Sequence, residues 1–193
     1  GLGNAGYGIS IDGAPNTAIG GIGQGNHIAG SGNAALVIFK SKATGTTVQG
    51  NVIGLDTYGA KPIANRVGVQ ISGGASNTLI GGGSKERNVI AHSTTTGVLV
   101  EGDGSVSNRI LGNSIFGSGY LNIDLAPLLV TPNDRLDQDT GPNFLQNFPV
   151  ITGATLRYGM LHITGTINTT PGAQVRVEIF RNVTGCYPNS GGP

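Results

Sequence analysis

The chain has 193 residues, of which 35 are glycine and only 11% are charged, and it contains no tryptophan. This composition has no Gly-X-Y period, which excludes collagen, and Gly, Pro and Asn clusters leave little room for long helices, so it indicates a turn-rich β protein. A net charge of +1 provides no electrostatic footprint for nucleic acid or an anionic membrane. No apolar run approaches the roughly eighteen residues of a membrane span, so we expect no membrane insertion. The single Cys186 excludes an internal disulfide.

Short apolar runs of three kinds recur in a fixed order along the first 115 residues. The first kind is rich in Ile, Val and Leu and occupies 8–11, 35–38, 68–71 and 97–100. The second kind follows at 18–21, 47–50, 79–82 and 109–112. The third kind has the form Asn-x-Ile and occupies 26–28, 51–53, 88–90 and 113–115. Each run has the length and composition of a β-strand, so the pattern predicts three short strands per repeat.

The repeats form pairs with a fixed spacing. Asn26 to Asn88 (88 minus 26) and Asn51 to Asn113 (113 minus 51) are both 62 residues. An Asn-Thr-x-Ile-Gly-Gly segment also occurs twice, at 16–21 and at 77–82. Three short strands per repeat are typical of a solenoid in which each strand pairs in parallel with its equivalent one coil further on. We therefore predict an all-β fold, a right-handed parallel β-helix of four to five coils that occupies residues 1–125.

The strand period of two assigns the residues of this solenoid to an inner and an outer side. Aliphatic ladders are predicted inside, and Ser10, Val37, Gln70 and Leu99 are predicted outside. Asn26, Asn51, Asn88 and Asn113 fall at a bend, where asparagine tolerates left-handed backbone and its amide can bond the equivalent amides above and below. The alternative is that these asparagines only mark solvated turns. Both interpretations are structural rather than catalytic.

The pattern changes after residue 125. Residues 120–125 still alternate and are predicted to begin a fifth coil, whereas Pro127 and Pro132 open a polar loop at 126–147. In the C-terminal β segment at 148–193, residues 156–167 and 174–180 alternate like strands, and 168–172 has the composition of a turn. We expect them to form the first hairpin of a β-sandwich-like module that is truncated here.

These landmarks, together with the segments at 52–59 and 139–150, resemble the secreted right-handed β-helix repeat proteins of bacteria, within the pectate-lyase-like superfamily. The resemblance implies an extracellular or cell-surface location and a larger multi-module protein. The opening Gly1-Leu2-Gly3-Asn4 is typical of the middle of a repeat, so we expect the chain to be a fragment that does not include the secretion signal. The functional implication is broad, because this superfamily includes pectate lyases, epimerases and adhesins.

Candidate catalytic groups do not converge in the predicted fold. Asp12 and Glu101 lie on the outer side of the first strands, three coil steps or roughly 14 Å apart, which is too far for a direct carboxylate pair. Lys40, Lys42 and Arg66 have no adjoining acidic cluster, and His27, His92 and His162 are scattered. We predict a non-catalytic extracellular structural or binding module whose partner is a polysaccharide or a cell-surface glycan. The alternatives are a polysaccharide lyase or epimerase, and a self-assembling filament unit formed by end-to-end association.

The best candidate ligand site is the polar segment at 133–143. Oxygen-bearing side chains alternate there before a glycine, a pattern typical of loops that wrap Ca²⁺. The predicted ligands are Asp134, Asp137 and Asp139, with Asn133 and Asn143 as neutral oxygen donors. The alternative is that these side chains only solvate a long loop.

Overall fold

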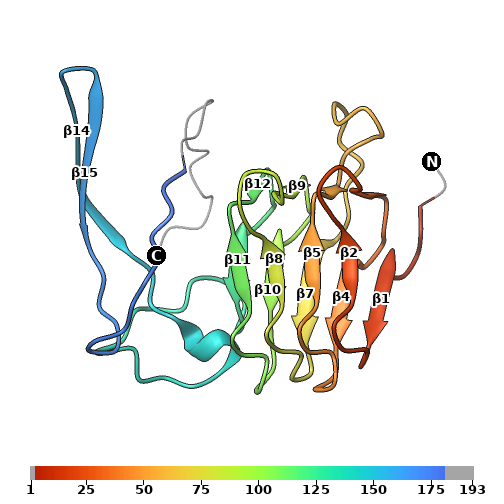
Figure 1. The fold of residues 1–193 in the computed structure, drawn as a ribbon, viewed down its shortest axis with the longest axis horizontal. Coiled ribbons are helices and arrows are strands. Elements are labelled where there is room, and N and C mark those ends of the chain that lie inside the picture. The colour runs from red at the N-terminus through yellow and green to blue at the C-terminus, as the bar shows by residue number, and fades with distance from the viewer. Residues whose placement is uncertain (1–2, 181–193) are drawn as a thin grey trace.

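The structure is a computed structural model that describes residues 3–180, and its main body is a parallel β-solenoid of about four turns with three strands per coil (Figure 1). The first sheet contains β1 (Ile9–Asp12), β4 (Ala34–Phe39), β7 (Val67–Ser72), β10 (Val98–Val100) and β13 (Ile123–Leu125). The second contains β2 (Ala18–Gly20), β5 (Thr47–Gln49), β8 (Leu79–Gly81) and β11 (Arg109–Leu111). The third contains β3 (His27–Ile28), β6 (Val52–Ile53), β9 (Val89–Ala91) and β12 (Ser114–Phe116). The predicted solenoid, including the start of its fifth coil, is confirmed.

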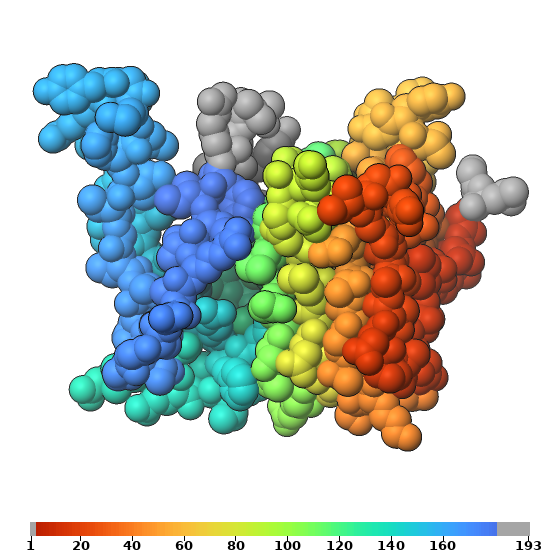
Figure 2. Space-filling view, in the orientation of Figure 1, coloured from red at the N-terminus to blue at the C-terminus, as the bar shows by residue number. Residues whose placement is uncertain are grey.

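The parallel register joins the predicted landmarks directly. Ile11 pairs with Ile38, and Ile38 pairs with Ile71. In the third sheet Ile53 pairs with Ile28 on one side and with Ile90 on the other. The ladders fill the interior with fully buried aliphatic side chains, which contribute about 1.5–3 kcal/mol each. Figure 2 shows the coils packed as successive bands in chain order, so each coil covers the next.

The outer side of the first sheet is more buried than the predicted inner and outer sides imply. Val37 and Leu99 lie on that side, as predicted, but they are only 2% and 6% exposed. They form a second apolar cluster with Ala34 and Val67, and Phe39 packs against it. The central strands of this sheet are therefore buried on both faces, which explains their almost continuous apolar sequence.

The C-terminal hairpin differs from the predicted one. β14 (Val150–Arg157) and β15 (Met160–Thr166) pair antiparallel through a turn at Tyr158 and Gly159, whose φ angles are 51° and 75°. Two left-handed residues make a tight turn whose twist matches that of paired strands. This turn lies inside the run 156–167, which the alternation assigns to one strand. The predicted pairing of 156–167 with 174–180 is therefore wrong, and residues 174–180 form no strand.

The hairpin lies at the end of the molecule far from residue 3, beyond a short 3₁₀ helix, η1 (Pro142–Leu145) (Figure 1). Within residues 3–180, no helix has the length and apolar character needed to cross a membrane.

Candidate functional site

Four asparagines form a hydrogen-bonded column along the corner between the second and third sheets, as the sequence predicted. The Nδ2 groups of Asn26, Asn51 and Asn88 donate to the Oδ1 of the next asparagine at 2.9, 3.0 and 2.9 Å. The backbone N–H of each donor residue bonds the same oxygen. The amides of Asn51, Asn88 and Asn113 also donate to Ile19, Val48 and Ile80 carbonyls. The column therefore satisfies buried polar groups and links successive coils.

Further asparagines serve the other corners. Asn65 accepts from the Ser31 N–H at 2.9 Å, and Asn108 accepts from the Thr78 N–H at 3.0 Å. Asn143, a predicted calcium ligand, accepts the Asn108 N–H at 2.9 Å and donates to the Asn108 carbonyl at 2.7 Å. Asn143 thus bonds the backbone groups that Asn108 exposes at a corner of the fourth coil.

The three predicted aspartates come together. Asp134, Asp137 and Asp139 are half-buried, and each offers one carboxylate oxygen within 4.8 Å of the others, so the group could hold a metal ion. The two predicted asparagine donors are engaged elsewhere: Asn143 with Asn108, and Asn133 with the backbone of Phe148 at 2.8 and 2.9 Å.

Asn147, which sequence reasoning did not single out, organises this acidic loop. It is 3% exposed. Its backbone N–H donates to Asp137 Oδ1 at 2.8 Å, and its Nδ2 donates to the carbonyls of Asp134 and Asn168 at 2.9 and 2.8 Å. Thr169 Oγ1 also donates to Asp137 Oδ2 at 3.1 Å. Asn147 precedes β14 while Asn168 and Thr169 follow β15, so the loop fastens both strands at the base of the hairpin.

Asp139 is the least satisfied member of the cluster. Its Oδ1 is buried and has no hydrogen-bond partner among residues 3–180. Burial, with the negative charges of Asp134 and then Asp137, raises the pKa of the Asp139 carboxyl. A cation would relieve both the repulsion and the missing partner.

Asp124 is a second unsatisfied carboxyl, on the outer side of β13 beside Leu99. It is 2% exposed, and Oδ2 accepts the Leu129 N–H at 3.0 Å, whereas Oδ1 has no partner among the described residues. Burial is the main reason that the pKa of Asp124 is raised above its ordinary value of 3.8. Sequence reasoning missed it because nothing in the repeat places an acid there.

We predict that Asp124→Asn stabilises the protein at neutral pH, by roughly 1–3 kcal/mol, because the variant keeps an acceptor for Leu129 and removes a buried charge. The folded-state pKa of Asp124 lies above its unfolded value, so the contribution of this carboxyl to stability is fully present below about pH 3.8 and is lost as pH rises through the folded pKa. Urea unfolding at pH 7 and pH 4.5 should show the advantage of the variant shrinking at the lower pH. A variant that is less stable at pH 7 would contradict this.

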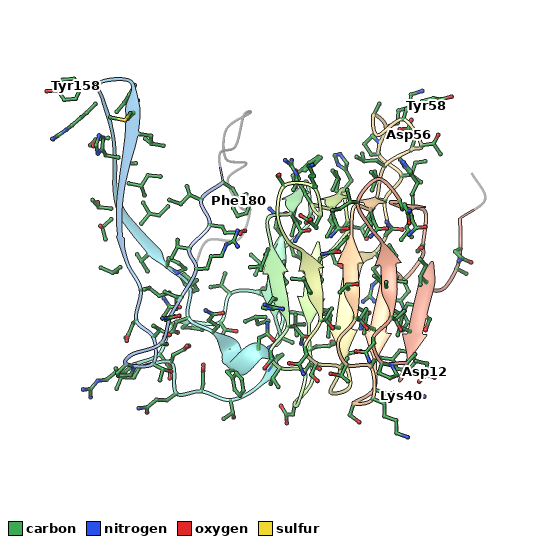
Figure 3. All side chains as sticks on the ribbon, in the orientation of Figure 1. Asp12, Lys40, Asp56, Tyr58, Tyr158 and Phe180 are labelled. Atoms are coloured by element: carbon green, nitrogen blue, oxygen red, sulfur yellow. The ribbon has the colours of Figure 1, made fainter. Side chains whose placement is uncertain are left out.

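The carboxylates considered for catalysis are engaged with their own neighbours. Asp12 forms an ion pair with Lys40 at one end of the first sheet (Figure 3), and Glu101 Oε1 accepts from Gln70 Nε2 at 2.5 Å. His92 lies edge-on to Phe116, with ring centroids 5.6 Å apart. Within residues 3–180 the three aspartates form the one group of closely spaced metal-capable side chains.

No protein-family model, curated protein or solved structure matches the chain. The class is therefore defined by the fold itself: a parallel β-solenoid of about four turns, followed by a loop that could hold a metal ion and then an antiparallel hairpin.

Proposed function

We propose that this chain is a non-catalytic extracellular module, a rigid β-solenoid that spaces or displays neighbouring parts and binds glycan or a cell surface. The observation that carries the proposal is that the corner asparagines form hydrogen bonds within the solenoid. Asn51 and Asn88 are buried and form hydrogen bonds between coils, so these polar side chains hold the rod together. The extracellular setting and kinship with secreted bacterial β-helix repeat proteins rest on the sequence resemblance.

A glycan partner is supported by two exposed tyrosines at the tips of turns, Tyr58 and Tyr158, which we call the tyrosine tips. Tyr58 and Tyr158 are 90% and 97% exposed, each beside a glycine in a turn, and both project on the same side of the molecule (Figure 3). A tyrosine ring combines an apolar face with a hydroxyl, which suits contact with the mixed polar and apolar surface of a sugar.

Calcium is the proposed ion of the acidic loop. Hard divalent cations favour carboxylate and carbonyl oxygens, and Asp134, Asp137 and Asp139 supply three carboxylates. The ion would neutralise their repulsion and give the buried Asp139 oxygen a partner. Because the same loop binds Asn147 and Thr169, calcium would also hold the base of the hairpin.

The competing function on this fold is a polysaccharide lyase or epimerase. Its test is incubation with a panel of uronate polysaccharides, in calcium, while the absorbance of unsaturated products is followed; epimerisation is followed by the proton spectrum of the polymer. We expect no product above the buffer blank. Sustained turnover that Asp12→Asn or Glu101→Gln abolishes would overturn the non-catalytic proposal.

A further inference from the structure

The two ends of the solenoid are finished differently. At the C-terminal end β11, β12 and β13 are edge strands too, but two side chains bond backbone groups of the last coil there. Glu178 Oε2 accepts the Gly112 N–H at 2.8 Å, and Asn143 bonds both the N–H and the carbonyl of Asn108. These backbone groups are satisfied by the chain itself.

The N-terminal edge lacks an equivalent among residues 3–180. There β1, β2 and β3 are the edge strands of their sheets, each paired on one side only. Ile9 and Ile19 are half-buried, whereas their partners Leu36 and Val48 in the next coil are fully buried. The first coil thus exposes unpaired strand edges and partly uncovered core side chains on the side where another coil could pack.

The asparagine column also ends at this edge, and the hydrogen bonds between its members all run in one direction, from each coil to the asparagine Oδ1 of the next. The Oδ1 atoms of Asn51, Asn88 and Asn113 each accept two bonds from the preceding coil. The Oδ1 of Asn26, at the start of the column, accepts none from residues 3–180. The edge therefore offers an acceptor and requires a donor.

The segment that leads into β1 follows the path of a connection between coils. Asn4 and Gly6 carbonyls accept from the Gly32 and Asn33 N–H groups at 2.5 and 3.1 Å. Asn65 and Arg66, which connect the second coil to the third, bond Thr94 and Thr95 in the same way at 2.8 and 2.9 Å. The chain therefore approaches β1 from the direction in which a preceding coil would lie.

We propose that the N-terminal edge is a coil-accepting surface, and that its occupant is one more coil of the same repeat, in parallel and in the same polypeptide. The asparagine of that coil would donate its N–H and Nδ2 to Asn26 Oδ1, and its strands would pair with β1, β2 and β3. A second copy fits less well. In an edge-to-edge contact, its own Asn26 would bring another acceptor. In an end-to-end contact, the N–H groups of Gly112 and Asn108 in its last coil are already bonded to Glu178 and Asn143.

The test supplies such a coil together with the coil before it, because residues 7–66 span a coil pair, β1 to β6. A variant carries a copy of residues 7–66 directly ahead of Tyr7, in place of residues 1–6, so the copied Arg66 precedes Tyr7 as it precedes Val67 in the natural chain. We expect its thermal midpoint to rise by more than about 5 °C. Asn26→Ala in the original segment should then lower the midpoint at least twice as much as in the unextended chain, because Asn26 has become an interior member of the column. An unchanged midpoint with an unchanged Asn26→Ala effect would overturn the proposal.

Amide hydrogen exchange on the unextended protein provides a second readout that does not depend on the variant folding. Amides of β1, β2 and β3 should exchange at least tenfold faster than those of β4, β5 and β6, at all protein concentrations. Equal protection in the two coils would overturn the proposal. Protection of β1 that grows with protein concentration would also overturn it, because a second copy would then occupy the edge.

Discussion

Asn88→Ala is expected to lower the free energy of unfolding by about 3–4 kcal/mol, which is large for one amide. Asn88 is fully buried. Its side chain donates to Asn113 Oδ1 and to the Val48 carbonyl, and it accepts both the N–H and the Nδ2 of Asn51. Alanine removes these bonds and leaves buried groups of Asn51 and Val48 without partners. Urea unfolding followed by circular dichroism measures the loss.

The matched control is Asn26→Ala at the open end of the same column. Asn26 is exposed, and its amide donates one bond, to Asn51 Oδ1, which keeps the Asn26 backbone N–H. We expect a loss of at most about 1 kcal/mol. Equal losses at the two positions would mean that the column does not stabilise the coils through buried hydrogen bonds.

Calcium is expected to raise the free energy of unfolding by about 2.7 kcal/mol at a hundredfold excess over its dissociation constant, if it binds only the folded loop. The physical reason is the repulsion among Asp134, Asp137 and Asp139, whose carboxylate oxygens lie within 4.8 Å of one another. Thermal unfolding with calcium and with a chelator measures the gain. Identical midpoints would mean that the loop is only a solvated connector.

Two variants separate ion binding from the loop's own hydrogen bonds. Asp139 Oδ1 has no partner among residues 3–180, so Asp139→Asn should abolish the calcium gain with little cost in chelator. Asp137 accepts from Asn147 and Thr169, so Asp137→Ala should abolish the gain and also lower stability in chelator. Calcium dependence that survives in both variants would place the ion elsewhere.

The repeat could be predicted from sequence because a parallel solenoid forces equivalent residues into register. Asn26, Asn51 and Asn88 stack because each is followed by an inward Ile that must enter the same ladder. The C-terminal hairpin has no repeated equivalents that could fix its register. Tyr158 and Gly159 form a turn within one alternating run, and a two-residue turn preserves the alternation on both sides. Periodicity alone could not locate that turn.

The acidic cluster could also be predicted from the sequence, because its members are neighbours in the chain. Asp134, Asp137 and Asp139 are close in sequence, so a short loop suffices to bring them together. The role of Asn147 depends on contacts with Asn168 and with the backbone of Asp134, across 21 and 13 residues, which local patterns do not encode. Asp124 is buried by the packing around β13, which the repeat does not encode either.

The central claim, a rigid spacer whose hairpin is fixed by calcium, is tested most directly by a distance measurement between the two tyrosine tips. In a Cys186→Ser background, spin labels at Tyr58→Cys and Tyr158→Cys report the distance between the solenoid loop and the hairpin turn (Figure 3). A second pair, at Tyr58→Cys and Lys85→Cys, stays within the solenoid and serves as the control. We predict one narrow distance distribution for the tip pair in calcium, which broadens in chelator, and no change for the control pair. A tip distribution as broad in calcium as in chelator would contradict the account.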